Sequence, residues 1–235
     1  LLLAGALFAG AASPARWRSA HIEAATTLAA APCLCVFDID RTLTGKQGWQ
    51  GQCQADQANP GVPDQAYAQG DLLLSGLAQQ IDNTFCSRCF RGIVTAGLAS
   101  GPNSQERAIL LRLLGGTKAT RSDFWQDIHF QADTVVHTSL VIQALDGKKQ
   151  NSVRSMVDWF RDHQSVALAD EDVHFFDDIA DNVKAFEGTG FNARQVSCNS
   201  RGPKENIPGS YDGKIGGCGG VPEEAIDSKG VHVCS

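Results

Sequence analysis

The chain has 235 residues, of which 43% are hydrophobic, and a formal net charge of −6. This length supports one substantial core and would be short for two full domains. The negative charge and the lack of a cluster of Lys and Arg argue against a nucleic-acid groove, which needs concentrated positive charge to displace counterions.

The first twelve residues, LLLAGALFAGAA, are apolar and precede a polar and basic stretch. A helix of this length spans about 18 Å, well short of a hydrocarbon core of about 30 Å. The run resembles the apolar region of a signal peptide, although a helix packed on the domain would give the same pattern. We assign residues 1–31 to a targeting or apolar segment, and expect membrane contact only through it, if it is retained.

Short apolar runs typical of strands alternate with amphipathic runs typical of helices from residue 32 to residue 198. The predicted strands are 33–37, 89–95, 138–145, 173–176 and 192–198, and the predicted helices are 71–81, 103–115, 149–163 and 180–188. This alternation implies right-handed crossovers and a parallel sheet covered on both faces. We therefore predict an α/β fold, a three-layer Rossmann-like domain over residues 32–235 with a central parallel sheet.

Composition and capping residues predict the structure of the connecting segments and the ends of one helix. Residues 45–65 are polar and rich in Gly, Pro and Gln, which predicts a loop. The second predicted helix begins at a capping box with Asn103 as its cap and ends at Gly115. Residues 198–235 form a Gly/Cys-rich extension, in which only 222–226 has the character of a short helix.

Eight cysteines suit structural disulfides formed in an oxidising compartment, either in a secreted protein or in an organellar lumen; they are Cys33, Cys35, Cys53, Cys86, Cys89, Cys198, Cys218 and Cys234. The alternatives are buried free thiols, or a zinc or redox role for the pair Cys86-Ser-Arg-Cys89. A zinc site would need a second pair of suitable spacing, which Cys33-Leu-Cys35 does not provide. A redox pair is expected at a strand-to-helix turn, whereas a predicted strand follows Cys89.

Polar side chains follow three predicted strands at the point where each strand ends. They are Asp38 and Asp40, then Thr95, then Asp177 and Asp178. The carboxyl ends of parallel strands meet at one edge of a sheet, and ligands bind there. Four carboxylates brought together repel one another unless a cation lies among them, and hard oxygen ligands without supporting His or Cys favour Mg2+.

These residues occur in four motifs that resemble those of the haloacid-dehalogenase-like phosphatase superfamily. The first is an apolar run followed by DxDxT, the second a strand ending in Thr, the third a Lys at the start of a helix, and the fourth a strand ending in two acids. In this chain they are read at 36–42, 92–95, Lys148 or Lys149, and 175–178. The resemblance covers residues 32–198, with the four motifs in order.

The resemblance implies a role for each residue. Asp38 would be the nucleophile that forms an aspartyl-phosphate, and Asp40 would protonate the leaving oxygen and later deprotonate water. Thr95 and a lysine would bind the phosphoryl oxygens. The ligands of Mg2+ would be the Asp38 carboxylate, the Asp40 main-chain carbonyl and Asp178, with Asp177 binding directly or through water.

Helical phase favours one of the two lysines. Lys149 lies four residues before Val153 and seven and eight before Met156 and Val157, which are apolar positions of the predicted helix. Its side chain would therefore begin the turn above the buried face, whereas Lys148 is one residue out of this phase. We prefer Lys149 and keep Lys148 as the alternative.

Other polar residues near the motifs have more ordinary interpretations. Thr42 is expected to order the turn after the nucleophile, and Arg41 to lie either at the pocket mouth or on the surface. Asp181 and Asn182 are interpreted as a helix cap rather than as ligands. Thr95 has a capping role as its alternative.

The predicted function is that of a Mg2+-dependent phosphomonoester hydrolase acting on a phosphorylated substrate. An acid at position 40 is implied for phosphatases and phosphomutases of the superfamily, and the short segments between motifs leave room for only a minimal cap. A phosphomutase would need a larger cap to exclude water. The alternative of another class is a catalytically idle member that serves as an interaction or assembly subunit.

The stretch FDIDRTLT carries a geometric requirement. The fixed alternation of side chains in a continuous strand would not let Asp40 turn back toward a phosphate held at Asp38. We therefore predict that the chain leaves the strand conformation at Asp38, so that Asp40 turns back toward the phosphate.

Overall fold

The structure is a computed structural model, and it describes four ranges of the chain: 32–47, 51–66, 70–201 and 216–235. They belong to one unit, Ala31–Ser235. The targeting segment predicted at residues 1–31 lies outside the described residues. Within the described ranges, no helix has both the length and the apolar character that a membrane crossing requires.

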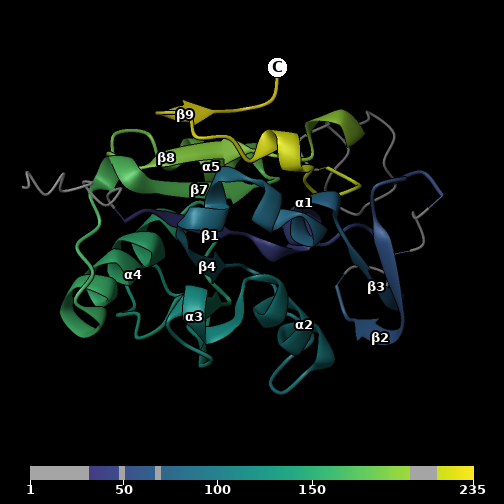
Figure 1. The fold of residues 1–235 in the computed structure, drawn as a ribbon, viewed down its shortest axis with the longest axis horizontal. Helices are drawn as coiled ribbons and strands as arrows, with labels where there is room; N and C mark the ends of the chain where they lie inside the picture. The colour runs from purple at the N-terminus through teal and green to yellow at the C-terminus, as the bar shows by residue number, and fades with distance from the viewer. Residues whose placement is uncertain (1–31, 48–50, 67–69, 202–215) are drawn as a thin grey trace, which may run out of the picture. The chain divides into compact units, whose positions relative to one another are not determined.

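A central sheet of seven parallel strands organises the unit, in the order β5-β6-β4-β1-β7-β8-β9 (Figure 1). The strands are β1 (Leu34–Phe37), β4 (Phe90–Val94), β5 (Trp125–Asp127), β6 (Leu140–Ile142), β7 (Val173–Asp177), β8 (Asn192–Gln195) and β9 (Val231–His232). The predicted α/β fold with a parallel sheet is confirmed. The edge strands β5 and β9 were not predicted, because they have three and two residues and little apolar pattern.

Helices cover both faces of the sheet, which makes the three predicted layers. Side chains of β1 alternate between two apolar clusters: Leu34 and Val36 lie in one, Cys35 and Phe37 in the other. The first cluster includes side chains of α4 and α5, and the second includes side chains of α1 and α2. The helices are α1 (Gly76–Gln79), α2 (Gln105–Leu113), α3 (Gly116–Thr120), α4 (Lys149–Gln164) and α5 (Ala180–Lys184).

A two-stranded antiparallel hairpin replaces part of the predicted loop and helix. It consists of β2 (Gln57–Asp64) and β3 (Gly70–Leu74), drawn in blue to one side of the central sheet in Figure 1. The loop prediction is wrong at 57–64 and the helix prediction is wrong at 71–74, whereas Gly76–Gln79 is helical as predicted. Strand β2 has poor strand propensity and its pairing shifts register between Asn59 and Pro63, so tertiary pairing rather than local sequence forms it.

Two helix boundaries also differ from the prediction. The cap of α2 is Ser104, whose hydroxyl accepts a hydrogen bond from the Arg107 N–H at 3.2 Å, and not Asn103, which has a φ of 61°. Within the predicted helix at 222–226, only Pro222–Glu224 is helical, as a short 3-10 turn, η6. The 3-10 turns are η2 (Ile81–Asn83), η3 (Phe85–Arg88), η4 (Asp170–Asp172), η5 (Cys198–Ser200) and η6 (Pro222–Glu224).

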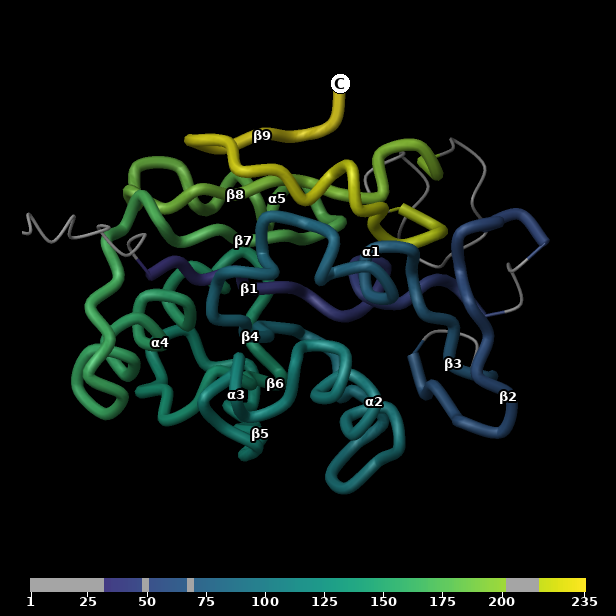
Figure 2. Tube along the Cα trace, viewed as in Figure 1, coloured from purple at the N-terminus to yellow at the C-terminus, as the bar shows by residue number. Residues whose placement is uncertain are grey.

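All eight cysteines form disulfides, which confirms the structural interpretation and excludes the free-thiol, zinc and redox alternatives for Cys86 and Cys89. The pairs are Cys33–Cys89, Cys35–Cys86, Cys53–Cys218 and Cys198–Cys234. Four disulfides fit an oxidising or secreted environment. Two of them fasten the C-terminal extension, whose last strand, β9, runs in yellow beside β8 (Figure 2).

The bridges Cys33–Cys89 and Cys35–Cys86 are nested. We therefore expect the loss of unfolding free energy on removing both bridges to exceed the sum of the two single losses. They close loops with sequence separations of 56 and 51 residues. While either remains, the unfolded chain stays closed across nearly the same loop. Removing one pair with alanines should therefore cost only the packing loss, about 1–2 kcal/mol. Removing both pairs should lower the free energy of unfolding by about 4 kcal/mol more than the sum of the two single losses, since the loop then opens.

Urea unfolding of the two double-alanine variants and of the quadruple variant measures this difference. Each variant would be compared at one pH and in the absence of reductant. Strictly additive losses of unfolding free energy would contradict the loop-closure argument.

Candidate active site

The first strand ends where the sequence pattern predicted. Asp38 N–H donates the last sheet hydrogen bond, to the Phe176 carbonyl at 2.9 Å, and the chain then enters a wide helical turn, η1 (Ile39–Leu43). Arg41 within this turn has a φ of 65°, and the Thr44 N–H closes the turn on the Ile39 carbonyl at 2.9 Å. The departure from strand conformation at Asp38 is confirmed. It frees Asp40 from the alternation of the strand.

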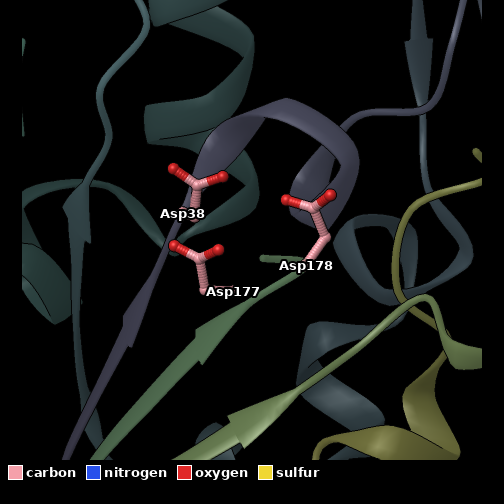
Figure 3. A group of neighbouring side chains, drawn as sticks. All are labelled: Asp38, Asp177 and Asp178. Atoms are coloured by element: carbon pink, nitrogen blue, oxygen red, sulfur yellow. The ribbon is translucent and has the colours of Figure 1, made fainter. Parts of the chain in front are cut away.

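Three carboxylates meet at the carboxyl ends of the adjacent strands β1 and β7. An oxygen from each of Asp38, Asp177 and Asp178 lies within 4.8 Å of the others, and all three residues are buried. Figure 3 shows the two strands running side by side, with the three carboxyl groups directed into one space. The sequence-predicted pairing of the first and fourth motifs at one edge of the sheet is present in the structure.

Lys149 is the lysine that reaches this group. It begins α4 and is 1% exposed, and its Nζ donates to Asp38 Oδ1 at 2.8 Å and to Asp177 Oδ2 at 2.7 Å. The neighbouring Lys148 is exposed and lies outside the cluster. The helical-phase argument is thus confirmed, because Val153 and Met156 on the same helix are fully buried.

Asn182 holds one side of the cluster and was interpreted wrongly as a helix cap. It is buried, its amide donates to Asp177 Oδ2 at 3.0 Å and to Asp146 Oδ1 at 2.9 Å, and its carbonyl accepts the Gly147 N–H at 2.7 Å. It therefore ties β7 to the loop before α4. Asp181 is exposed, in agreement with its exclusion as a ligand.

Strand β8 and the C-terminal extension both support Asp178. The Gln195 amide donates to the Asp178 carbonyl at 2.8 Å, and the Gly216 N–H donates to its Oδ2 at 3.3 Å. Gly216 in turn accepts a hydrogen bond from Arg41 Nη1 at 3.0 Å. Arg41 is fully buried, so both of its predicted positions, at a pocket mouth or on the surface, are wrong. This hydrogen bond joins η1 to the extension.

Thr42 acts through its main chain rather than its side chain. Its carbonyl accepts the Gly220 N–H at 2.9 Å, which fastens η1 to the extension a second time. Its hydroxyl is buried and has no hydrogen-bond partner among the described residues. The prediction that Thr42 orders the turn is supported only for the backbone.

The Asp40 carboxyl group and the Thr95 hydroxyl both lie close to Gly97. The Thr95 hydroxyl is fully buried and accepts the Gly97 N–H at 3.2 Å, and no helix begins there, so its alternative role as a helix cap is wrong. A Cβ on Gly97 would lie 2.3 Å from Asp40 Oδ2 and 3.5 Å from Thr95 Oγ1. Only glycine leaves room for the Asp40 carboxyl in this position.

The electrostatics of the cluster call for an additional cation. Burial raises the pKa of Asp38 to about 8, against the attraction of Lys149 and with further repulsion from Asp177. Burial and then repulsion from Asp177 and Asp38 raise the pKa of Asp178 well above its usual range. For Lys149 burial opposes the ammonium, but Asp177 and Asp38 outweigh it and raise its pKa. Arg201 also attracts Asp178, yet the pKa of Asp178 stays raised, so Lys149 and Arg201 together do not balance this set of carboxylates.

A hard divalent cation fits this donor set. Asp38 and Asp178 offer buried carboxylate oxygens whose charged form a cation would stabilise, and no soft ligand lies among the three. Both oxygens of Asp177 already accept hydrogen bonds, from the Ile179 N–H at 2.7 Å and from Lys149 at 2.7 Å. Asp177 is therefore better suited to fixing Lys149 than to direct coordination.

Two further acids lie near Asp40, and the sequence patterns did not single them out as residues of the site. Asp64 at the end of β2 and Glu106 in α2 are each 1% exposed. Burial, followed by repulsion from Asp64 and Glu106, raises the pKa of Asp40 to about 7. At neutral pH a substantial fraction of Asp40 therefore carries a proton, as a general acid requires.

Comparisons with known proteins identify no family. No family model matches the chain, and no curated protein matches it. Among solved structures, the crystal structure of a hypothetical protein from Xanthomonas campestris is 18% identical with a TM-score of 0.35, over 69% of this chain. The match spans 63% of that protein's length. A similarity of this size carries no functional argument.

Proposed function

We propose that this protein is a Mg2+-dependent phosphomonoester hydrolase that acts through an aspartyl-phosphate. The observation that carries the proposal is the meeting of Asp38, Asp178 and Lys149 at the carboxyl ends of β1 and β7, with a proton-holding Asp40 two residues after Asp38. The order and roles of these residues match those that the resemblance to haloacid-dehalogenase-like phosphatases implies.

The chain's own residues supply the steps of the reaction. An Asp38 carboxylate oxygen attacks phosphorus, and the bond from phosphorus to the alcohol oxygen breaks as the new bond forms. Asp40 gives its proton to the leaving oxygen. Lys149 and Thr95 bind the phosphoryl oxygens and hold them in place for attack.

The second step regenerates the enzyme. Asp40, now ionised, takes a proton from a water molecule whose oxygen attacks phosphorus, and the bond between phosphorus and Asp38 breaks. Inorganic phosphate leaves, and Asp40 again carries a proton. Mg2+, held by Asp38, the Asp40 main-chain carbonyl and Asp178, would neutralise the charge of the carboxylates and the phosphoryl group.

Hydrolysis of p-nitrophenyl phosphate tests the proposal. The protein with its disulfides intact should release p-nitrophenol in Mg2+, and excess EDTA should lower the rate by at least about 100-fold until Mg2+ is restored. The background is set by Asp38→Asn in the same buffer. A wild-type rate in Mg2+ that does not exceed this background would refute the enzymatic function.

Replacing Gly97 with alanine should impair turnover without unfolding the domain. The new methyl would occupy the position of the Asp40 carboxyl, at 2.3 Å from Oδ2, and would displace the general acid. We expect kcat to fall about 10²–10³-fold, the share of general acid–base catalysis, with a smaller change in KM. Gly51→Ala is the matched control, because a Cβ at Gly51 meets no atom within 4 Å. Equal kcat values for the two variants would show that Asp40 does not need this position.

A further inference from the structure

A cavity of about 270 Å³ is lined by Asp40 but not by Lys149 or the three carboxylates of the cluster. Its walls include Asp64 at the end of β2, Gly97 and Ser100 after β4, and Glu106 in α2. In the proposed reaction Asp40 protonates the oxygen of the departing alcohol. The alcohol part of the substrate would therefore lie next to Asp40, which lines this cavity.

The cavity presents buried acceptors that the protein leaves incompletely paired. Glu106 is 1% exposed; its Oε2 accepts the Ser100 hydroxyl at 2.5 Å, but its Oε1 has no hydrogen-bond partner among the described residues. Asp64 accepts the Ala66 N–H at 2.8 Å through Oδ1. A buried carboxylate oxygen without a donor costs free energy that a ligand carrying a donor would recover.

A metal ion does not account for these acids. Within the described ranges, the acidic side chains whose oxygens come within 4.8 Å of one another as a group of three are Asp38, Asp177 and Asp178. Asp40, Asp64 and Glu106 form no such group, so one small ion cannot bind all three. A ligand that extends across the cavity can approach each of them.

The charge of the cavity favours a cationic ligand. Asp64 repels both Asp40 and Glu106. Arg41 attracts Asp40 and Asp64, and Arg107 attracts Glu106, but burial still raises the pKa of each of the three acids on balance. An ammonium group in the cavity would face carboxylates from two sides and would form charge-assisted hydrogen bonds.

Building on the proposed function, we propose that the cavity binds a protonated primary amine on the alcohol part of the substrate, so that the enzyme's substrates are phosphate monoesters of small amino alcohols. Primary ammonium is favoured over quaternary ammonium because the unmatched oxygen of Glu106 requires an N–H donor.

Matched esters test this inference through ratios of kcat/KM in Mg2+. The wild-type protein should hydrolyse 2-aminoethyl phosphate at least about 10-fold more efficiently than propyl phosphate, whose alkyl group has nearly the same size and carries no charge. It should also hydrolyse 2-aminoethyl phosphate more efficiently than phosphocholine. In Glu106→Gln the preference over propyl phosphate should fall to about 1–3-fold, because the amide keeps the shape and loses the charge. Asp64→Asn should lower the same ratio and serves as a second variant.

The control and the p-nitrophenyl phosphate assay separate the possible failures. Glu187→Gln, at an exposed glutamate outside the cavity, should keep the wild-type ratio. If p-nitrophenyl phosphate is hydrolysed but the amine and the propyl ester react equally well, the inference is overturned and the proposed function stands. A preference that persists unchanged in both cavity variants would also overturn it. If no ester is hydrolysed in Mg2+, the proposed function fails and the inference fails with it.

Discussion

Asp38→Asn should reduce kcat for p-nitrophenyl phosphate at least about 10⁴-fold, the largest loss expected from any single substitution in this protein. The amide has nearly the shape of the carboxylate but is a poor nucleophile, so no covalent intermediate can form on it. It also removes one carboxylate from the buried cluster, which eases the repulsion that raises the pKa of Asp178. The variant should consequently be at least as stable as the wild type in EDTA, so that lost activity cannot be attributed to unfolding.

Acid quenching during turnover measures the intermediate directly. Mass spectrometry of peptides from the quenched wild-type protein should locate one phosphoryl group on Asp38, and the same peptide of Asp38→Asn should carry none. Asp123→Asn is the matched control, because Asp123 is exposed and lies in the loop before β5. It should retain full activity. A phosphorylated peptide that contains another residue, or an Asp38→Asn variant within about 10-fold of the wild type, would refute the nucleophile assignment.

The parts of the site that the sequence predicted are those fixed by regular secondary structure. Asp38, Thr95 and Asp177 follow or end buried strands, and parallel strands bring their carboxyl ends to one edge. Lys149 could be separated from Lys148 because the helix has a buried face of known period. In each case a local pattern predicted the position of the residue in its strand or helix, and the parallel sheet brought the strand ends to one edge.

The remaining residues of the site depend on tertiary contacts that no local pattern records. Asp64 ends a strand that pairs only because β3 lies beside it, and its segment looks like a polar loop in the sequence. Glu106 sits in the first turn of a helix, where acids are common without any functional role. Asn182 is of a residue type that is common at helix caps, and only its contacts with Asp177 and Asp146 show that it orders the cluster. Single polar residues outside a repeating pattern carry too little signal to be placed.

The burial of Arg41 is a further feature that the local sequence could not predict. Arg41 is adjacent to the first motif, and a charged residue next to a reactive one is ordinarily solvated. Its burial requires the left-handed φ of 65° and the carbonyl of Gly216, which lies 175 residues away in the sequence. The extension that supplies this carbonyl has no regular pattern. Its position is fixed instead by the Cys53–Cys218 bridge.

The second large effect is expected at Lys149, and it concerns stability as well as rate. Its ammonium contacts Asp38 and Asp177 at 2.8 and 2.7 Å and lies 3.4 Å from Asp146. Lys149→Met keeps the apolar stem and leaves the buried carboxylates without this partner. In EDTA we expect the free energy of unfolding to fall by about 3–5 kcal/mol, as for other buried ion pairs that lose one member. In Mg2+ we expect kcat to fall about 10²–10³-fold, since a phosphoryl-binding donor is lost.

Lys148→Met makes this prediction discriminating, because the two lysines are adjacent and only Lys149 is buried. Urea unfolding in EDTA and in Mg2+ should show Lys148→Met close to the wild type, whereas Lys149→Met should be destabilised in EDTA and should regain more stability from Mg2+ than the wild type does. The larger gain follows because the cation then relieves repulsion that the ammonium relieves in the wild type. If Mg2+ stabilised both variants equally, Lys149 and the metal would not share the same carboxylates, and the assignment of Asp38 and Asp178 as ligands would have to be abandoned.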